Sequence, residues 1–345
     1  MVPWTFDGVI LPGGDTGHVE VTGSPSGCSE RLPGRYALPG LVDAHAHLTV
    51  LGDHTLGDEA LARERLEEYA AAGVATVRDV GGRSEVTLHL ANLPQPGLPA
   101  VLAAGRFLAP AGRYFPGMHE PVTAQGLLAT ALGEISGGAT WLKLIGDFPL
   151  LDPAGRPVPG SLAPTYDLDT VKDLLDLAHA HGARVAVHTQ SRHVNELVTA
   201  GLDSVEHGEW ISEDGVDALG ERAGAWTPTL AAITGVPTDA PAKRRAYAAE
   251  ASERLRMLLP RAVASGVRVL AGTDNAASVA HEIALLARHG LTPEQALAAG
   301  STAAAWLYPS LQVADSLVTY ETDPRDDPEV LFAPAAVVIR GQRVR

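Results

Sequence analysis

Four histidines and one aspartate stand at positions where they could bind a metal ion. His45 and His47 lie two residues apart at the end of an apolar run, so on a strand both imidazoles point to the same side. His188, His207 and Asp274 stand at or just after the ends of later apolar runs. If these runs are parallel strands of a barrel, their carboxyl ends meet at one mouth, where barrel enzymes carry their active sites. Imidazole and carboxylate ligands together suit zinc or a similar divalent ion.

Lys143 is the most unusual residue near this set, because it lies inside the apolar run Trp141–Ile145. A cation in a buried apolar strand is costly unless it is neutralised or paired. Carboxylation of the amine by carbon dioxide would remove this cost, since the anionic carbamate can bridge two metal ions and offset their charge. We therefore expect a carboxylated Lys143. The alternative is an ordinary lysine whose amine reaches the end of the barrel.

The segments that must position these residues alternate between short apolar runs and longer runs rich in Ala and Leu. Such alternation indicates βα units and a parallel sheet. Eight apolar runs are what a (β/α)8 TIM barrel requires, so we predict an α/β fold of this class. The runs are Leu41–His47, Ala75–Asp79, Ala100–Ala104, Thr140–Ile145, Arg184–His188, Asp203–His207, Ala225–Thr229 and Arg268–Thr273.

Helices are predicted between these runs from their end signals. Thr292 and Pro293 are typical of an N-cap and a first helical residue, and they predict a helix over Glu294–Ala299. Four other segments stop at a glycine directly before a strand, as helices commonly do. These segments are Leu56–Ala72, Leu168–His181, Arg192–Ala200 and Lys243–Ser265.

Both ends of the chain are rich in Gly and Pro and carry short alternating runs, such as Trp4–Ile10, His18–Thr22 and Ala335–Ile339. We predict that residues 1–38 and 312–345 pair into a small β-sandwich domain. Residues 39–311 would then form the barrel domain.

Composition excludes several classes of protein. With 345 residues, 46% of them hydrophobic, the chain can bury a sizeable core and is not disordered. Cys28 is the only cysteine, which excludes a disulfide scaffold. The net charge of −15 argues against a nucleic-acid or anionic-membrane partner. No signal peptide and no apolar run of about 18 residues is visible, so a cytoplasmic protein is expected.

The ordered set of motifs resembles the amidohydrolase superfamily. It is nearest to the imidazolonepropionase-like branch, which includes the binuclear Xaa-Pro dipeptidases (prolidases). The resemblance covers nearly the whole chain, and Leu291–Leu297 resembles the helix after the last strand in that branch. The other positions that carry it are Pro39–His47, Lys143, His188, His207 and Gly272–Asp274.

The resemblance implies a binuclear centre of two divalent ions, with zinc as the first choice. His45, His47 and Asp274 would hold the more buried ion, His188 and His207 the second, and carboxylated Lys143 would bridge them. A hydroxide shared by the ions would be the nucleophile, because two Lewis acids lower the pKa of bound water towards about 7. Asp274 would accept its proton and pass it to the leaving nitrogen.

The substrate side is predicted from a loop that follows the third strand. His119 resembles a loop histidine of this branch, and we expect it to act in catalysis by binding the substrate's carbonyl oxygen or a carboxylate. Tyr114, Arg113 and Trp210 are substrate-binding candidates by position only, and packing or surface roles are their alternatives.

The function that these inferences favour is hydrolysis of a C–N amide-type bond in a small molecule. A dipeptide such as Xaa-Pro, an N-acyl amino acid or a related amide is the expected substrate. Alternatives in the same superfamily are a mononuclear heterocycle deaminase, which would generally lack the bridging lysine, and a lactone or carbamate hydrolase. A non-catalytic, zinc-stabilised barrel is the alternative of another class, although it has no use for Asp274 as a base. Assembly as a homo-oligomer is left open.

Overall fold

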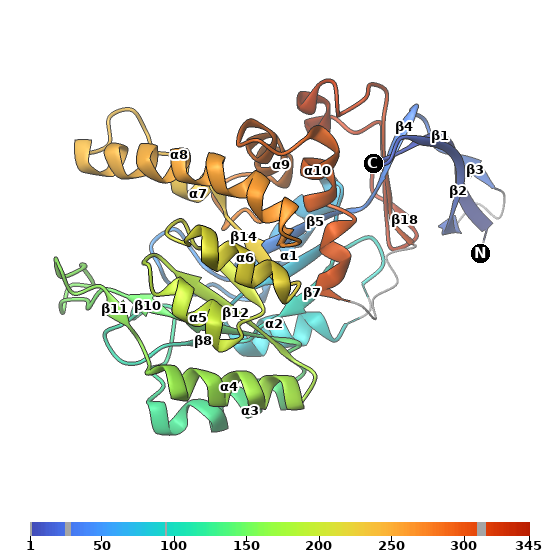
Figure 1. Ribbon diagram of the computed structural model, residues 1–345. Helices are drawn as coiled ribbons and strands as arrows, with labels where there is room; N and C mark the ends of the chain where they lie inside the picture. The colour runs from blue at the N-terminus through green and yellow to red at the C-terminus, as the bar shows by residue number, and fades with distance from the viewer. Residues whose placement is uncertain (1, 25–28, 94, 309–314) are drawn as a thin grey trace.

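The computed structural model of the protein describes residues 2–24, 29–93, 95–308 and 315–345 (Figure 1). Within these ranges it is an α/β protein, and the strands of the two chain ends lie together at one side (Figure 1). Cys28 and the predicted domain boundary at residues 311/312 fall outside the described ranges. None of the described helices combines the length and the apolar character that crossing a bilayer requires.

Parallel strands form two sheets in the middle of the chain. One has the strand order β5-β6-β7 and the other the order β15-β14-β13-β12-β9-β8. Every neighbouring pair in both sheets is parallel. The strands are β5 (Leu41–Ala46), β6 (Val74–Asp79), β7 (Ala100–Ala103), β8 (Phe107–Leu108), β9 (Trp141–Ile145), β12 (Arg184–Thr189), β13 (Ser204–His207), β14 (Ala225–Thr227) and β15 (Arg268–Val269).

The first strand lies beside the segment that follows the last one. The backbone N–H of Ala44 donates to the carbonyl of Ala271 at 2.9 Å, and that of Val42 donates to Gly300 at 2.8 Å. The fold is therefore TIM-barrel-like, and each predicted apolar run overlaps one strand. The eighth strand is shorter than predicted, because the N–H of Ala271 donates to Ala299 and leaves the ladder with β14. The two-residue strand β8 was not predicted.

Helices follow the strands, and all five predicted helices are present. The α10 helix begins at Pro293, and the Thr292 hydroxyl accepts from Gln295 N at 3.2 Å as its N-cap. The α1 helix begins at Glu59, later than predicted, because the Asp58 carboxylate is the cap. The helices are α1 (Glu59–Ala71), α2 (Ser84–Ala91), α3 (Leu127–Ser136), α4 (Leu168–Ala180), α5 (Val194–Ala200), α6 (Glu213–Glu221), α7 (Leu230–Thr234), α8 (Ala242–Ala264), α9 (Val279–Arg288) and α10 (Pro293–Ala299).

The chain ends share one seven-stranded sheet of order β18-β17-β16-β4-β1-β2, with β3 paired to β1. Its central contact joins β4 to β16 in antiparallel register. The predicted pairing of the two ends is therefore present as a sheet. The strands are β1 (Val2–Ile10), β2 (Asp15–Ser24), β3 (Glu30–Arg31), β4 (Tyr36–Pro39), β16 (Leu317–Tyr320), β17 (Ala336–Ile339) and β18 (Gln342–Arg343). A further short hairpin, β10 (Asp147–Phe148) and β11 (Ala163–Pro164), follows β9.

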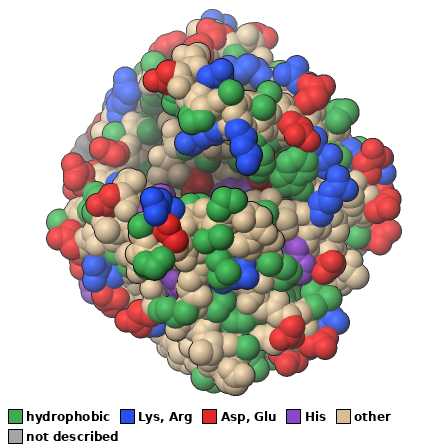
Figure 2. Space-filling view, turned by 90° about the vertical axis from the view of Figure 1, so that its left-hand side faces the viewer, with side chains coloured by type: hydrophobic (Ala, Val, Ile, Leu, Met, Phe, Trp, Pro, Cys, Tyr) green, Lys and Arg blue, Asp and Glu red, His purple; other side chains and the backbone are tan. Residues whose placement is uncertain are grey.

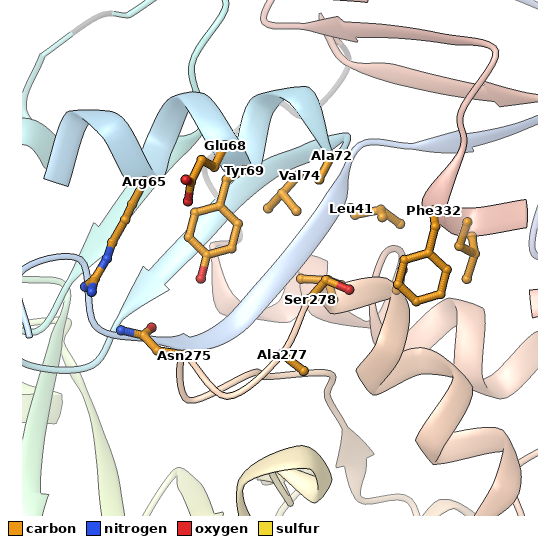
Figure 3. Close-up of a pocket in the computed structure, with 13 residues that line it drawn as sticks. Leu41, Arg65, Glu68, Tyr69, Ala72, Val74, Asn275, Ala277, Ser278 and Phe332 are labelled. Carbon is orange, nitrogen blue, oxygen red and sulfur yellow. The ribbon is translucent and has the colours of Figure 1, made fainter. Parts of the chain in front are cut away.

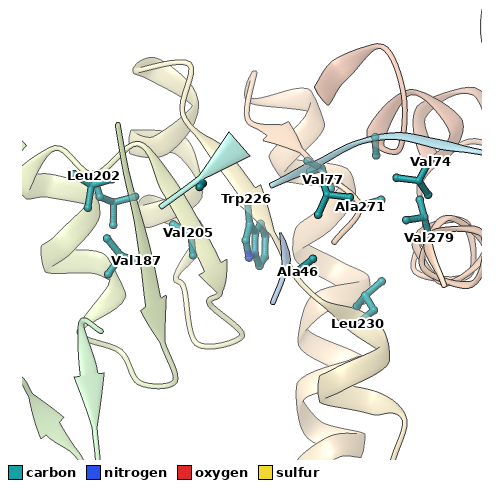
Figure 4. Packing of buried hydrophobic residues seen from close by; sticks show 14 of the residues in the cluster. Ala46, Val74, Val77, Val187, Leu202, Val205, Trp226, Leu230, Ala271 and Val279 are labelled. Carbon is teal, nitrogen blue, oxygen red and sulfur yellow. The ribbon is translucent and has the colours of Figure 1, made fainter. Parts of the chain in front are cut away.

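Apolar side chains pack on both faces of the parallel strands. Figure 4 shows Val187, Val205 and Trp226 on neighbouring strands, with Leu230 and Val279 on helices of the same buried cluster. A separate cluster gathers residues from successive strands around the fully buried Trp141. Polar residues at the carboxyl ends of the strands lie beyond these apolar clusters and line a cavity.

Candidate active site

A cavity of about 350 Å³ lies at the carboxyl ends of the parallel strands. All six residues predicted to bind metal line it. They are His45, His47, Lys143, His188, His207 and Asp274. Figure 2 shows one face of the molecule hollowed near its centre, with acidic and histidine side chains visible inside, as expected for the mouth of such a cavity.

His45, His47 and Asp274 form the tightest group in the cavity, with one potential ligand atom from each lying within 4.8 Å of the others. Oδ1 of Asp274 is 3.2 Å from Nε2 of His47 and 3.5 Å from Nε2 of His45. The Nδ1 atom of His47 faces the Gly81 carbonyl at 2.8 Å, and that of His45 faces a Glu206 carboxylate oxygen at 2.6 Å. A carbonyl and a carboxylate only accept hydrogen bonds, so both Nδ1 atoms carry the proton.

In the neutral rings each Nε2 therefore carries a lone pair, and one potential ligand atom of each ring lies close to a carboxylate oxygen of Asp274. Three acceptors at this separation repel one another unless a cation lies between them. Within the described residues, Nε2 of His45 is buried and has no hydrogen-bond partner. This donor set fits a divalent metal ion.

His188, His207 and Lys143 form the other half of the group. The ring centroids of His188 and His207 are 4.6 Å apart, and His207 is 5.0 Å from His45. Nδ1 of His207 contacts the Thr229 hydroxyl at 2.7 Å, and no hydrogen bond joins its Nε2 to another described residue. Nζ of Lys143 is buried with no partner in the part of the chain that the structure describes. Among the described residues, the amine thus lies unpaired in the wall of the cavity that His188 and His207 also line.

Burial sets the charge state of these groups. It lowers the pKa of His45 and His188 well below the usual value and that of His207 to about 4, so the imidazoles are neutral at pH 7. It also lowers the pKa of Lys143 to about 8. Burial alone would raise the pKa of Asp274, but the adjacent imidazoles of His45, His47 and His207 hold it below its ordinary value. Neutral imidazoles and an ionised carboxylate are the ligand states that a metal needs.

The backbone is strained where it carries these groups. His207 (φ 64°), Asp274 (φ 50°), Asn275 (φ 57°) and Thr229 (φ 47°) all adopt the left-handed region. Non-glycine residues rarely do so, and such strain clusters at functional sites. Local bonds hold the strained loop: Asp274 N donates to the carbonyl of His45 at 2.7 Å. The Asn275 side chain bridges both backbone polar atoms of His47, at 3.0 and 2.8 Å.

Of the four predicted substrate-side residues, only Tyr114 lines the cavity. Arg113 instead donates to the carbonyls of Phe148 and Ser161, both at 2.8 Å, and so ties the β10–β11 hairpin to the barrel. Trp210 lines a different cavity, beside Arg254 of α8. Periodicity places strand ends but not loop side chains, which is why these positions were not distinguished.

His119 lies next to the cavity without lining it. Its Nδ1 contacts the carbonyl of Phe115 at 3.0 Å, and its ring centroid is 5.7 Å from that of Tyr114. The neighbouring Met118 does line the cavity. The Nε2 atom of His119 is buried and has no partner among the described residues.

Several residues of the site were not predicted from the sequence. The outer wall of the cavity is mostly apolar and comes from two loops, through Val50, Leu51, Phe115 and Met118. His54 stacks on Phe115 with ring centroids 3.9 Å apart, which holds the two loops together. The available signal was the presence of apolar residues in the loops that follow β5 and β8.

Arg65 and Asn275 were also missed, and they separate the active-site cavity from a second one. This side cavity has a similar volume, about 350 Å³, and lies between α1 and α9. Figure 3 shows Arg65 and Asn275 at one end of it and Phe332 at the other. Nη1 of Arg65 donates to the carbonyls of His47 and Leu48 at 2.6 and 3.1 Å, so this wall also holds the loop that carries His47.

Comparison with known proteins places the chain among relatives with this architecture. The profile of the amidohydrolase family matches residues 158–308. An uncharacterized protein of Mycobacterium tuberculosis is 35% identical over 335 residues, which cover 92% of this chain and 87% of the relative. An imidazolonepropionase of Nocardia farcinica is 39% identical over 70 residues, 20% of this chain and 16% of that protein.

A solved structure agrees with the fold over its full length. The crystal structure of a prolidase complexed with N-methylphosphonate-L-proline superposes with a TM-score of 0.80 at 22% identity and covers all of both chains. The resemblance found in the sequence is thus confirmed, and the chain belongs to the amidohydrolase family of hydrolases.

Proposed function

We propose that the protein is a metal-dependent hydrolase that cleaves a C–N amide-type bond of a small molecule. The observation that carries this proposal is the convergence of the Nε2 lone pairs of His45 and His47 with Oδ1 of Asp274 in an accessible cavity. A structural zinc site is closed by its own ligands, whereas this group opens on about 350 Å³ of space. The cavity thus favours catalysis over the non-catalytic alternative.

Two divalent ions, most simply zinc, are proposed for the cavity. His45, His47 and Asp274 would hold one, His188 and His207 the other, and carboxylated Lys143 would bridge them. Burial supports the carboxylation, because a lysine pKa of about 8 leaves a larger fraction of the amine neutral and able to react with carbon dioxide. An unmodified lysine would add a positive charge to a site that already takes two cations. A lysine at this position also disfavours the deaminase alternative.

When bound, the ions would supply an activated water and polarise the scissile carbonyl. Asp274 is proposed to take the proton of the attacking water on its carboxylate and to deliver it to the leaving nitrogen. The bond from its backbone N–H to the His45 carbonyl fixes its position for both transfers. His119 stays a proposed second catalytic residue, which would act from beside Met118.

The outer wall supports a substrate with an apolar group. Val50, Leu51, Tyr114, Phe115 and Met118 line the cavity together with the residues predicted to bind metal. Arg65 also lines the cavity and would pair with a carboxylate. These features fit an N-acyl amino acid or a dipeptide such as Xaa-Pro with a bulky apolar side chain. Arg113 and Trp210 are proposed to contact only substrates that extend beyond this cavity.

The finer features of the fold are also proposals. We infer that the two parallel sheets close into one eight-stranded barrel over residues 39–311, which the bond between Ala44 and Ala271 supports. Residues 1–38 and 312–345 would form the small β-sandwich, supported by the sheet that both ends share. A cytoplasmic location, a small-molecule substrate and the absence of nucleic-acid or membrane partners stay predictions.

A hydrolysis screen tests the proposal. The protein, loaded with zinc in bicarbonate buffer, is assayed against dipeptides, N-acyl amino acids, lactones and aryl amides. Amide hydrolysis that Lys143→Ala abolishes is the expected result, with Lys172→Ala, an exposed lysine on α4, as the matched control. Full activity of Lys143→Ala would remove the bridging role. Activity against lactones alone, or a single zinc per chain with unmodified Lys143, would replace the proposed reaction with one of the alternatives.

A further inference from the structure

A buried pair of opposite charges lies directly behind the metal-binding residues. Arg78 on β6 and Glu206 on β13 are both fully buried, and their side chains meet with Nη2 of Arg78 2.7 Å from Oε1 of Glu206. The other carboxylate oxygen of Glu206, Oε2, accepts the hydrogen bond from Nδ1 of His45 at 2.6 Å. The pair is therefore connected to the cavity through the imidazole of His45, which lies between Glu206 and the cavity.

Every polar atom of this pair has a bonding partner. The Ser204 hydroxyl donates to Oε1 of Glu206 at 2.5 Å, and Nη1 of Arg78 donates to the same hydroxyl at 3.1 Å. Arg78 also donates through Nε to the carbonyl of Ala44 at 2.5 Å and through Nη2 to the Thr227 hydroxyl at 3.1 Å. The network thus joins the backbone or side chains of four strands, β5, β6, β13 and β14.

The guanidinium of Arg78 is also fixed from the side, because its central carbon lies 4.5 Å from the ring centroid of Trp141. A cation over an indole ring in a desolvated position is held strongly in orientation. Neither Arg78 nor Glu206 can therefore rotate without breaking several contacts. The direction of the Glu206 carboxylate towards His45 is set by the fold.

His45 differs from the other predicted metal-binding histidines in this contact. Nδ1 of His47 faces the Gly81 carbonyl, and Nδ1 of His207 faces the Thr229 hydroxyl. Nε2 of His188 faces the side-chain amide of Gln190. All three partners are neutral groups. Among the described residues predicted to bind metal, only His45 has a carboxylate on the ring nitrogen opposite the one that faces Asp274. A carboxylate behind a histidine fixes its tautomer and raises the basicity of the nitrogen that binds the metal.

We propose that Glu206, oriented by Arg78, is a positioning residue that holds Nε2 of His45 as the metal-binding atom and so sets the affinity of the site for its more buried ion. The inference rests on the proposed function, since it needs a metal at His45. It assigns a role that stability alone does not explain, because buried ion pairs often contribute little net stability compared with apolar residues of similar size.

The test measures zinc affinity separately from folding stability. Zinc binding is followed by competition with a chromophoric chelator, and the stability of the metal-free protein is followed by urea unfolding. Glu206→Gln should weaken binding of the tighter zinc ion by about 10- to 100-fold, the range found for residues that support metal-binding histidines. The matched control is Glu282→Gln. Glu282 is fully buried and accepts hydrogen bonds from Leu230 N and Ala231 N, so its variant should bind zinc as the wild type does.

The double variant Arg78→Met with Glu206→Gln separates positioning from structure. It removes both charges, so it should recover stability lost in Arg78→Met, where Glu206 is left buried and unpaired. Zinc affinity should stay weak, because a neutral amide still stands behind His45. Ser204→Ala removes one bond to Glu206 without leaving a charge unpaired, and it gives a smaller loss of affinity in the same direction if Glu206→Gln does not fold.

Two results would overturn the proposal. Wild-type zinc affinity in folded Glu206→Gln would show that the carboxylate is not needed, and recovery of affinity together with stability in the double variant would reduce the pair to a structural element. A wild-type protein that takes up no divalent ion is a different result, since it removes the proposed function itself and the inference with it.

Discussion

Oδ1 of Asp274 lies 3.2 Å from Nε2 of His47, and in the neutral imidazole, whose Nδ1 donates to the Gly81 carbonyl, both facing atoms are acceptors. Two acceptors at this distance require a proton or a metal ion between them. The arrangement is held from outside by the Asn275 side chain, which bonds to the backbone of His47. We therefore expect a divalent cation to stabilise the folded chain when it binds between these atoms.

The first prediction concerns metal removal. Chelation should lower the unfolding temperature, and added zinc should restore it, because the ligands come together only in the folded chain. The gain is about 2.7 kcal/mol when free zinc is 100 times its Kd. Differential scanning calorimetry with and without zinc measures it. His45→Asn should lose the effect and His179→Asn, an exposed histidine, should keep it; equal zinc shifts in both variants would contradict the site.

The second prediction concerns Asp274→Asn. An amide can still coordinate a metal weakly but cannot accept a proton, so bound zinc should persist in part while kcat falls by about 10²- to 10⁴-fold. Zinc content and steady-state rates are measured on the same preparation. Asp53→Asn, an exposed aspartate in the loop before α1, is the control. Retained turnover in Asp274→Asn would contradict its role as proton carrier.

The third prediction concerns the outer wall. Phe115→Ala removes the ring that stacks on His54 and lines the cavity, so it should raise KM for substrates with a bulky apolar group. Removing apolar contacts in a pocket costs about 1–3 kcal/mol, which corresponds to a roughly 10- to 200-fold loss in kcat/KM. Substrates with a small acyl group should be affected less. Leu150→Ala, which is exposed outside the cavity, should change neither; equal losses for small and bulky substrates would argue against this contact.

The fourth prediction concerns pH. Burial raises the pKa of Glu282 to about 8, against an ordinary value of 4.5, although two backbone N–H groups oppose the shift. The folded state thus holds more protons than the unfolded state between these values. The stabilisation is full below pH 4.5 and is lost as the pH rises through about 8. Glu282→Gln keeps the neutral form at every pH.

Urea unfolding of wild type and Glu282→Gln at pH 5 and pH 9 measures this difference. The free energy of unfolding of the variant minus that of the wild type should be larger at pH 9 than at pH 5. A constant difference between the two proteins across this range would show that Glu282 does not change its protonation state on unfolding.

The parts of the site that follow from strand periodicity were predictable from the sequence. His45, His188 and His207 end apolar runs, and parallel strands in a barrel bring such ends to one mouth. The structure places all of them on one cavity, together with Lys143 and Asp274. The alternation of residues along the strands was therefore enough to predict which side chains gather at this cavity.

Loop side chains were not predictable in the same way, because no period fixes their direction. Arg113 and Trp210 follow strands just as Tyr114 does, yet only Tyr114 lines the cavity. Arg78 and Glu206 stand inside buried strands, and their opposite charges could have suggested that they form an ion pair. Their contact joins strands far apart in the chain, and the sequence alone does not give the register that brings them together.

The pairing of β4 with β16 joins the C-terminal segment to the strand that directly precedes β5. Pro39 ends β4, and one glycine later the chain enters β5, which carries His45. Proteolytic cleavage between α10 and β16, followed by loss of the C-terminal fragment, would remove the strand that pairs with β4. The integrity of the last thirty or so residues is thus a quality criterion for any preparation used in metal titrations, and intact mass should be recorded beside each one.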